Sequence, residues 1–223
     1  MGFNKAQTEA ITQKEGPIMV LAGPGSGKTL VITRRIQYLI QKHQVRPEEI
    51  LVVTFTKAAT AEMRERFLRL MDGKHLPVTF GTFHGIYYGI LKWAYRLNSD
   101  HILSEEEKNG LIKEAAGQVE CELEIDDEKE FLSGIASEIG MIKNNRIDLE
   151  EFTSSQCPAH VFRQIYQEYE RMRNQRRKLD FDDMLVLCYD LFVKRPDILR
   201  KWQERYTYIL IEEFQDINRV QYD

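Results

Sequence analysis

One glycine-rich stretch constrains this chain more than any other feature of its sequence. It runs Gly23-Pro24-Gly25-Ser26-Gly27-Lys28-Thr29. We interpret it as a phosphate-binding loop of the type G-x-x-x-x-G-K-[ST]. In such loops the glycines let backbone N–H groups turn inward around phosphate oxygens, and the following helix N-terminus adds partial positive charge.

The segments on either side of the loop support this interpretation. The apolar run Ile18–Ala22 comes before it and is predicted to be a buried strand. Apolar residues at helical spacing follow between Leu30 and Ile40. A phosphate loop requires this strand–loop–helix context, whereas a chance glycine-rich turn does not. We expect Lys28 to reach the β- and γ-phosphates of a nucleotide and the Thr29 hydroxyl to hold Mg²⁺.

Two adjacent carboxylates follow another predicted strand. Tyr208–Ile211 has the pattern of a buried strand, and Glu212 and Glu213 come directly after it. A nucleotide-hydrolysing site needs one acid that binds Mg²⁺, usually through water, and one that orients or deprotonates the attacking water. The alternative is that the two acids only begin a solvated loop.

Composition and charge narrow the class of protein. Of the 223 residues, 43% are hydrophobic and 30% charged, which is close to an ordinary globular composition. No apolar run is long enough to span a bilayer, and no signal region is present, so we expect a cytoplasmic protein without a membrane partner. The three cysteines, Cys121, Cys157 and Cys188, are too scattered to predict a zinc site or disulfides.

The net charge of −4 does not exclude a polyanionic partner, because the negative charge is concentrated. Residues 104–130 hold eleven acids and three lysines, so the remainder of the chain is mildly basic. Nucleic-acid binding depends more on where the charged residues lie than on the net charge of the chain.

The order of apolar runs predicts an α/β fold with a helical insertion. Ile50–Phe55 and Val78–Thr82 are further predicted strands, and Ala58–Leu70 and Phe83–Leu97 are predicted helices. Continuous apolar strands that alternate with helices indicate a parallel sheet covered on both faces. Between residues 98 and 178 only helices are predicted. Their expected starts are a capping box at Ser104–Glu107, a similar signal at Asp148–Glu151, and Pro158 in the first turn of a long helix.

Five ordered boxes make the chain similar to the UvrD/Rep-type DNA helicases of superfamily one. Glu212-Glu213-Phe214-Gln215-Asp216 resembles motif II, and Leu179–Met184 resembles the segment that precedes it. The remaining boxes are similar to the Q motif, motif Ia and motif Ib; they are Phe3–Gln7, Thr54–Ala59 with Glu62, Met63 and Arg66, and Gly81–His84. The resemblance spans nearly the whole chain.

The resemblance implies a P-loop NTPase fold with a RecA-like parallel sheet. Residues 1–97 and 179–223 would form the RecA-like ATP-binding domain, and residues 98–178 the all-helical inserted subdomain. ATP and Mg²⁺ would be the cofactors, bound by Gln7 and by Gly23, Pro24, Gly25, Ser26, Gly27, Lys28 and Thr29. Glu212 would bind the metal, Glu213 would be the catalytic base, and Gln215 would couple nucleotide state to DNA.

Several of these residues also have plain structural interpretations. Asn4 and Gln7 fit a capping box, whereas the family implies that Gln7 also reads the adenine edge. Thr56 and Lys57 can be a helix cap and a solvated charge, or can bind the DNA backbone. The family places Thr82, Phe83 and His84 on the single-stranded DNA path, with Phe83 as a stacking or a packing residue.

Two polar stretches in the second half have weaker functional interpretations. Asp180 and Asp182 are expected to cap the next helix, without a catalytic role. The basic stretch Arg171–Lys178 is expected to be a solvated face, with a DNA contact as the alternative.

The implied activity is ATP hydrolysis coupled to movement along single-stranded DNA and to strand separation at duplex–single-strand junctions. The family pattern continues beyond Asp223 with a second RecA-like domain, so we expect this chain to be an N-terminal piece with little activity alone. The resemblance also implies that the strand carrying motif III, which lies between the phosphate-loop strand and the motif II strand of the same sheet, would come after Asp223. Its absence predicts an altered sheet, self-association or low stability. Alternatives are a subunit of a helicase–nuclease, or a nucleotide- or DNA-binding module without motor activity.

The motif II box departs from the family at its first residue. The usual box begins with Asp, and this chain has Glu212. The extra methylene places the carboxylate up to ~1.5 Å farther out. We expect the longer side chain either to fold back or to replace a bridging water by direct ligation of Mg²⁺.

Overall fold

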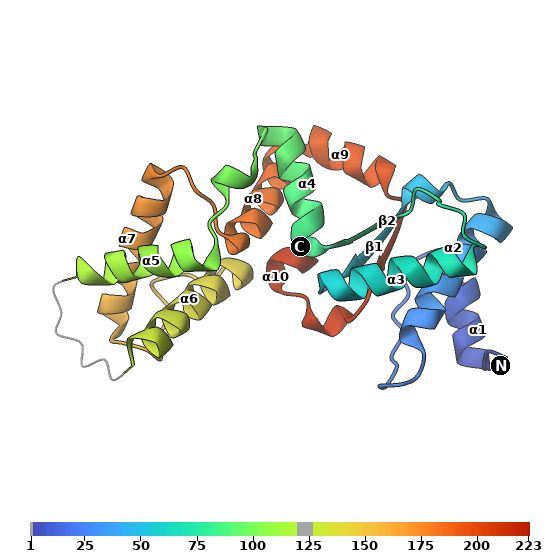
Figure 1. The fold of residues 1–223 in the computed structure, drawn as a ribbon, viewed down its shortest axis with the longest axis horizontal. Coiled ribbons are helices and arrows are strands. Elements are labelled where there is room, and N and C mark those ends of the chain that lie inside the picture. Colours follow the sequence, from blue (N-terminus) through green and yellow to red (C-terminus); the bar gives the residue numbers. More distant parts are fainter. Residues whose placement is uncertain (1, 120–126) are drawn as a thin grey trace. The chain divides into compact units, whose positions relative to one another are not determined.

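The computed structural model describes residues 2–119 and 127–223 (Figure 1). Its α-helices are α1 (Lys5–Thr12), α2 (Lys28–His43), α3 (Lys57–Leu70), α4 (Phe83–Tyr95), α5 (Glu105–Gly117), α6 (Glu128–Asn145), α7 (Ala159–Gln175), α8 (Phe181–Lys194), α9 (Pro196–Arg205) and α10 (Arg219–Tyr222). The strands are β1 (Ile50–Thr54), β2 (Thr79–Thr82) and β3 (Tyr208–Ile211), and the 3₁₀ turns are η1 (Pro47–Glu49), η2 (Ser99–His101) and η3 (Phe214–Asp216). No helix of the described ranges is both long and apolar enough to cross a membrane.

The chain divides into two compact units. The first comprises Met1–Gly85 and Arg195–Asp216, and the second comprises Ile86–Lys194 and Ile217–Asp223. The predicted domain limits of 1–97 with 179–223, and of 98–178, differ from these limits. The reason is that α8 packs against α6, and most of α4 also belongs to the second unit.

The first unit contains a parallel sheet with the order β2-β1-β3. Val52 in the central strand lies opposite Phe80 on one side and Leu210 on the other. All five residues of β1 are buried, as expected for a strand covered on both faces. Helices α2 and α3 lie side by side along the sheet (Figure 1) and bury Ile36, Leu39, Met63 and Phe67 against it. This arrangement confirms the predicted α/β class.

The predicted strand at Ile18–Ala22 is not present, which corrects the sequence interpretation. The segment belongs to no strand, and Ile18, Met19, Val20 and Leu21 are 41%, 68%, 52% and 89% exposed. An extended segment becomes a strand only when a neighbour satisfies its backbone N–H and C=O groups. Within the described ranges β3 pairs only with β1, and nothing links its other edge to this segment.

The second unit is helical, as predicted, and has its own core. Helices α5, α6 and α7, together with Leu103 just before α5, form this core, which includes Ile112, Ile135, Phe162 and Ile165. The capping box between Ser104 and Glu107 starts α5, as predicted. The predicted long helix is α7, and Pro158 is its N-cap, one position before the predicted first turn.

The second unit differs from the sequence prediction in two details, a turn in place of a helix start and a short parallel bridge. Residues Asp148–Glu151 form a turn rather than a helix start, although the Asp148 carboxylate accepts the N–H of Glu150. The chain does not continue as a helix because Ser154 and Ser155 bond to Glu138 of α6. Ile102, in the region where only helices were expected, forms a parallel bridge with Leu179, the first residue after that region. Within the described residues Cys157 and Cys188 form no disulfide. Cys121 and four acids of the acidic segment, Glu120, Glu122, Glu124 and Asp126, lie outside the described residues.

Candidate nucleotide-binding site

The glycine-rich loop leads directly into α2. Gly25 and Gly27 have φ values of +73° and +82°, a region that side chains with a Cβ rarely adopt. Counted back from Gly27, the first position of the phosphate-loop pattern falls on Ala22, so the match is not strict. Ala22 is tolerated because its φ is not positive. No side chain caps the N-terminus of α2, so its backbone N–H groups remain available for an anion.

Helix α1 is tied to this loop through Gln7. Asn4 and Gln7 form the predicted capping box, in which each side chain accepts a backbone N–H from the other residue. The Gln7 amide also donates to the Ser26 carbonyl oxygen at 3.0 Å. The structural interpretation of Gln7 is confirmed, and its side chain lies at the loop, where an adenine contact remains a proposal.

The two carboxylates after β3 meet the start of α2. The Glu212 N–H donates to the Val53 carbonyl oxygen, which extends the β3–β1 pairing by one residue. The Thr29 hydroxyl donates to Glu212 Oε1 at 3.0 Å, across 183 residues of sequence. The Lys28 ammonium lies 2.6 Å from Glu213 Oε1, and both side chains are about one-third exposed. The loop and the acidic pair therefore form one polar site within the first unit.

Gln215 completes this group. Its amide nitrogen donates to Glu213 Oε2 at 2.7 Å, so both oxygens of that carboxylate are occupied. The hydrogen bonds from Lys28 and Gln215 lower the pKa of Glu213 below the usual range, which keeps the carboxylate ionised. Glu213 also has a left-handed backbone, with φ of +52°, a conformation uncommon for a residue other than glycine.

The donor atoms present suit a magnesium–nucleotide complex. Mg²⁺ prefers hard oxygen ligands and is usually bound through one or two protein groups together with phosphate oxygens and waters. The Thr29 hydroxyl and the Glu212 carboxylate provide two such oxygens. No group of three His, Cys, Asp or Glu side chains that could form an all-protein metal cage occurs in the described ranges.

The residues proposed for DNA contact cap helices at the ends of β1 and β2. Thr56 caps α3 by accepting the N–H of Ala59, and the Thr82 hydroxyl accepts the N–H of Gly85 at the start of α4. Phe83 is only 5% exposed and packs edge-to-face on Phe55. Phe83 was expected to be either a base-stacking or a packing residue, and the structure supports packing. Lys57, in the first turn of α3, is exposed, and His84 is half-buried.

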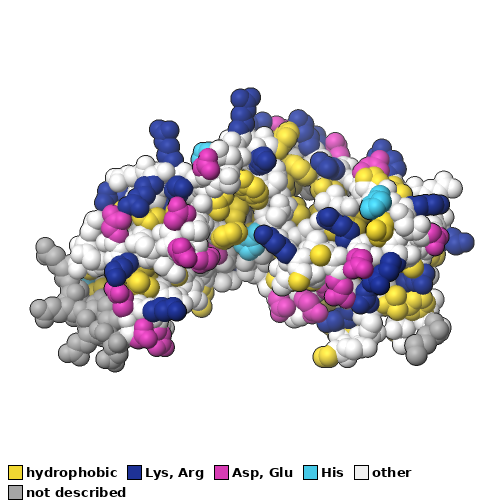
Figure 2. All heavy atoms as spheres, viewed as in Figure 1, with side chains coloured by type: hydrophobic (Ala, Val, Ile, Leu, Met, Phe, Trp, Pro, Cys, Tyr) yellow, Lys and Arg dark blue, Asp and Glu magenta, His cyan; other side chains and the backbone are white. Residues whose placement is uncertain are grey.

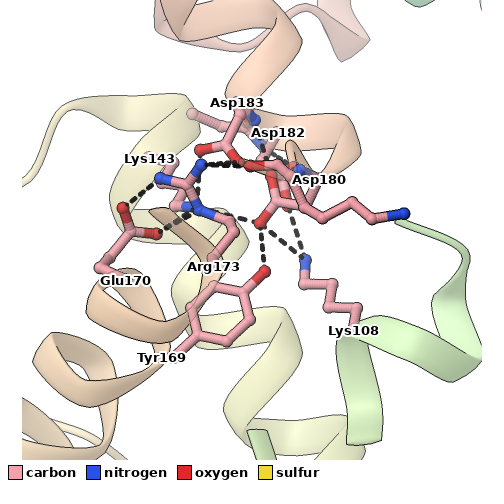
Figure 3. Close-up of polar contacts among 10 residues, drawn as sticks. Lys108, Lys143, Tyr169, Glu170, Arg173, Asp180, Asp182 and Asp183 are labelled. Atoms are coloured by element: carbon pink, nitrogen blue, oxygen red, sulfur yellow. Dashed lines mark hydrogen bonds and ion pairs between the residues drawn. The ribbon is translucent and has the colours of Figure 1, made fainter. Parts of the chain in front are cut away.

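Sequence reasoning missed a buried ionic cluster in the second unit (Figure 3). We define the ionic cluster as Lys108, Lys143, Tyr169, Glu170, Arg173, Asp180, Asp182 and Asp183. At its centre the Lys143 ammonium contacts carboxylate oxygens of Glu170, Asp180 and Asp183 at 2.7–2.9 Å. Lys108 is paired to Asp182 at 2.9 Å, and the Tyr169 hydroxyl donates to Asp180 at 2.7 Å.

The cluster also starts α8. Asp180 and Asp183 each accept the other's backbone N–H, at 2.8 and 2.7 Å, so Asp180 caps the helix as predicted. Asp182 instead bonds to Lys108 and Asn144. The only sequence signal for this cluster was the closely spaced acids of Leu179–Met184, because its cations come from three other helices.

The basic stretch Arg171–Lys178 is largely neutralised. Its ion pairs join Arg171 to Glu168, Arg173 to Glu170 and Asp183, Arg176 to Glu114, and Lys178 to Glu107. Figure 2 likewise shows basic and acidic side chains interspersed over the visible face. The stretch therefore does not form a block of uncompensated positive charge.

Comparison with known proteins assigns the chain to a family. The family model of the UvrD/REP helicase N-terminal domain matches residues 3–223. The chain is 41% identical over its whole length to a putative ATP-dependent DNA helicase, YjcD, of Bacillus subtilis, and spans 30% of that protein. It is 34% identical to a probable DNA helicase II homologue of Mycoplasma capricolum and 32% identical to the ATP-dependent DNA helicase PcrA of Staphylococcus aureus, spanning 31% and 30% of these relatives. The chain belongs to the UvrD/Rep helicase N-terminal domain family.

Proposed function

We propose that this chain is the ATP-binding part of an ATP-dependent DNA helicase that couples ATP hydrolysis to movement along single-stranded DNA and to duplex unwinding. The observation that supports this most is the meeting of Lys28 and Thr29 with Glu213 and Glu212. Hydrolysis of a nucleotide requires the phosphate-binding residues and the acids to lie close together in space. Similarity to a family does not by itself guarantee this arrangement. The named relatives, which are themselves described as helicases, support the same activity.

Each residue has a proposed role that follows from its position. The uncapped N-terminus of α2, with Lys28, would bind the phosphates, and Gln7 would contact the adenine beside the loop. Thr29 and Glu212 would hold Mg²⁺, which would offset phosphate charge when bound. Glu213 would accept a proton from the attacking water, and Gln215 would orient Glu213 through the hydrogen bond that already links them.

The DNA contacts are proposed at the ends of β1 and β2. Thr56 and Lys57 lie at the N-terminus of α3, and Thr82 and His84 lie at that of α4. Hydroxyls, lysines and helix N-termini are common ligands of phosphate. Phosphate contacts carry no sequence information, so binding to single-stranded DNA should be weak, insensitive to sequence and reduced steeply by salt. Tight, sequence-specific binding that persists at high salt would contradict this assignment.

ATP hydrolysis with and without single-stranded DNA tests the proposal directly. The chain spans only about 30% of its relatives, so the assay compares the 223-residue chain with a polypeptide extended by its natural downstream sequence. We expect DNA to stimulate hydrolysis in the extended polypeptide and not in the 223-residue chain. Nucleotide binding without stimulated hydrolysis in both would favour a binding module without motor activity.

A further inference from the structure

The last turn of α4 exposes two aromatic side chains beside two basic ones. Trp93 and Tyr95 are 55% and 52% exposed. Lys92 and Arg96 are exposed as well, and Arg96 directly follows the helix with a left-handed φ of +56°. We define these four residues as the aromatic–basic patch; all of them lie within the second unit.

The positive charge of this patch is not neutralised by neighbouring acids. The basic stretch Arg171–Lys178 is largely paired with glutamates and with Asp183. By contrast, neither Lys92 nor Arg96 forms an ion pair with any residue that the structure describes. Uncompensated positive charge attracts polyanions such as nucleic acids. Aromatic rings beside such charge offer a surface on which unpaired bases can stack.

A glycine keeps the helix surface beside the patch open. Gly89 lies four residues before Trp93 and therefore on the same side of α4. Beyond its chain neighbours and the backbone of α4, no described atom lies within 4 Å of the position that a Cβ of Gly89 would occupy. Packing within the protein therefore does not require glycine here, although glycine in a helix interior is less stable than alanine. A ligand that closely approaches the helix beside the Trp93 ring would require it.

We propose that the aromatic–basic patch binds single-stranded nucleic acid, with unpaired bases stacked on Trp93 and Tyr95 and phosphates bound by Lys92 and Arg96. The inference rests on the proposed function for the class of ligand, and it adds a contact in the second unit to those proposed at the ends of β1 and β2. Stacking requires unpaired bases but tolerates any sequence, because every base has a π-face. The patch therefore favours single strands over duplexes without selecting a sequence.

The affinity for a labelled oligodeoxythymidine, measured at low salt by fluorescence anisotropy, tests the proposal on the 223-residue chain. Trp93→Ala should weaken binding at least about 5-fold, the lower limit for loss of one base–aromatic stack, whereas Trp93→Phe should retain most of the affinity. Lys92→Ala should reduce the slope of log K against log salt concentration by about 0.7, the value for one phosphate contact on a single strand. Met141→Ala, at a 48% exposed apolar position on α6, should bind like the wild type.

Tryptophan fluorescence locates the contact independently of affinity. The chain has two tryptophans, Trp93 and Trp202. Trp202 is half-buried and stacks on Tyr206 within the first unit. A thymine stacked on Trp93 should quench its emission, and this quenching should be lost in Trp93→Phe although that variant still binds. Gly89→Leu, which adds bulk beside the ring, should weaken binding and leave the circular dichroism spectrum unchanged.

Lys57→Ala, at the DNA contact proposed in the first unit, separates this inference from the proposed function. Weaker binding by Lys57→Ala with unchanged binding by Trp93→Ala would overturn the inference, would favour a protein partner for the exposed rings, and would leave the proposed function intact. The reverse result would support the patch and contradict the contact at Lys57. Equal weakening of single-strand and duplex binding by Trp93→Ala would overturn base stacking. Absence of binding by the folded wild type at low salt would overturn both assignments.

Discussion

Lys28 and Glu213 neutralise each other at the centre of the candidate nucleotide site. Their 2.6 Å contact joins the cation that would bind phosphate to the carboxylate that would act as base. A nucleotide phosphate must therefore compete with Glu213 for the Lys28 ammonium. When the phosphate succeeds, Glu213 is released from Lys28 and remains bonded to Gln215, which would hold it for a role in hydrolysis.

Replacing Glu213 by glutamine should separate binding from chemistry. A neutral amide competes less for Lys28, and partly exposed ion pairs contribute ~0.2–1 kcal/mol, so ADP affinity of Glu213→Gln should rise about 1.5–5-fold. In the extended polypeptide the same change should nearly abolish DNA-stimulated ATP hydrolysis. Glu204→Gln, which removes an exposed charge on α9 of the same unit, should change neither quantity. A fall in ADP affinity of Glu213→Gln would contradict the competition.

At the level of elements, the ionic cluster connects four helices of the second unit. Lys108 comes from α5, Lys143 from α6, Glu170 and Arg173 from α7, and the acids from the start of α8 (Figure 3). Its central residues are almost fully buried, including Lys143 and Asp180. Charges removed from water are costly unless each is paired, so the cluster stabilises one arrangement of these helices only while it is complete.

Removing the central cation should destabilise the second unit strongly. Lys143→Met leaves the carboxylates of Asp180, Asp183 and Glu170 with too few buried partners, and such losses cost ~3–5 kcal/mol. Urea unfolding monitored by helical circular dichroism measures the change. Lys129→Met, on the exposed N-terminal turn of the same helix, should alter the free energy of unfolding by less than ~0.5 kcal/mol. A loss below ~1 kcal/mol for Lys143→Met would show that the cluster is not a unit.

The cluster should also make stability depend on pH near neutrality. Burial raises the pKa of Asp183 to about 6, and the charge of Asp180 adds to this, against the opposing effect of Lys143 and Arg173. An unfolded aspartate has a pKa of ~3.9. Because the folded value is higher, the stabilising contribution of this proton is present at low pH and is lost as the pH rises through about 6.

Asp183→Asn isolates this contribution, since asparagine does not titrate. The free energy of unfolding of the wild type relative to Asp183→Asn should increase when the pH is lowered from 7.5 to 5. Asp180 should not add to the change over this range. Burial disfavours its ionisation, but Lys143, Lys108 and the Tyr169 hydroxyl lower its pKa below the usual range. A difference that is constant or that decreases toward pH 5 would contradict the raised pKa.

Capping patterns within a few residues predicted most helix starts. Contacts between residues far apart in the sequence could not be predicted. The helix starts at Asn4 and Ser104 follow from capping hydrogen bonds between residues within one turn. The start of α7 follows from Pro158, whose ring fixes its own φ without any capping side-chain hydrogen bond. Asp148 has the same local signal but caps only a turn, because Ser154 and Ser155 just beyond it bond to Glu138 of α6 and hold the chain in a loop. Lys143 could not be placed in the cluster from sequence, since its partners lie up to 40 residues away.

At the level of the whole molecule, the sheet of the first unit ends at β3 within the described ranges, and the resemblance had led us to expect an altered sheet. Tyr208–Ile211 has the apolar character of an interior strand, yet within the described ranges β3 pairs on one side only, and Ile209 is 58% exposed. The segment Ile18–Ala22 has the same character and is also exposed. A pattern of apolar residues predicts that a segment can be buried, but pairing also requires a neighbouring strand.

An exposed apolar edge strand predicts self-association of the 223-residue chain. Such an edge presents unpaired backbone groups to other chains, and an added lysine blocks this pairing. We expect sedimentation velocity to show concentration-dependent association that Ile209→Lys reduces. Val193→Lys, at an exposed apolar position on α8, should leave association unchanged. A chain that is monomeric at all accessible concentrations, or association equally reduced by both variants, would contradict this explanation.

The affinity for ADP of the wild type and Lys28→Ala tests most directly whether the loop, α2 and the acidic pair form a nucleotide site. Isothermal titration calorimetry would compare the two with Lys42→Ala, which removes an exposed lysine at the opposite end of the same helix. Lys28 would contribute charge-assisted hydrogen bonds of ~1.5–3 kcal/mol, so Lys28→Ala should weaken binding by about 10–150-fold, whereas Lys42→Ala should bind like the wild type. Equal affinities of wild type and Lys28→Ala would contradict the site.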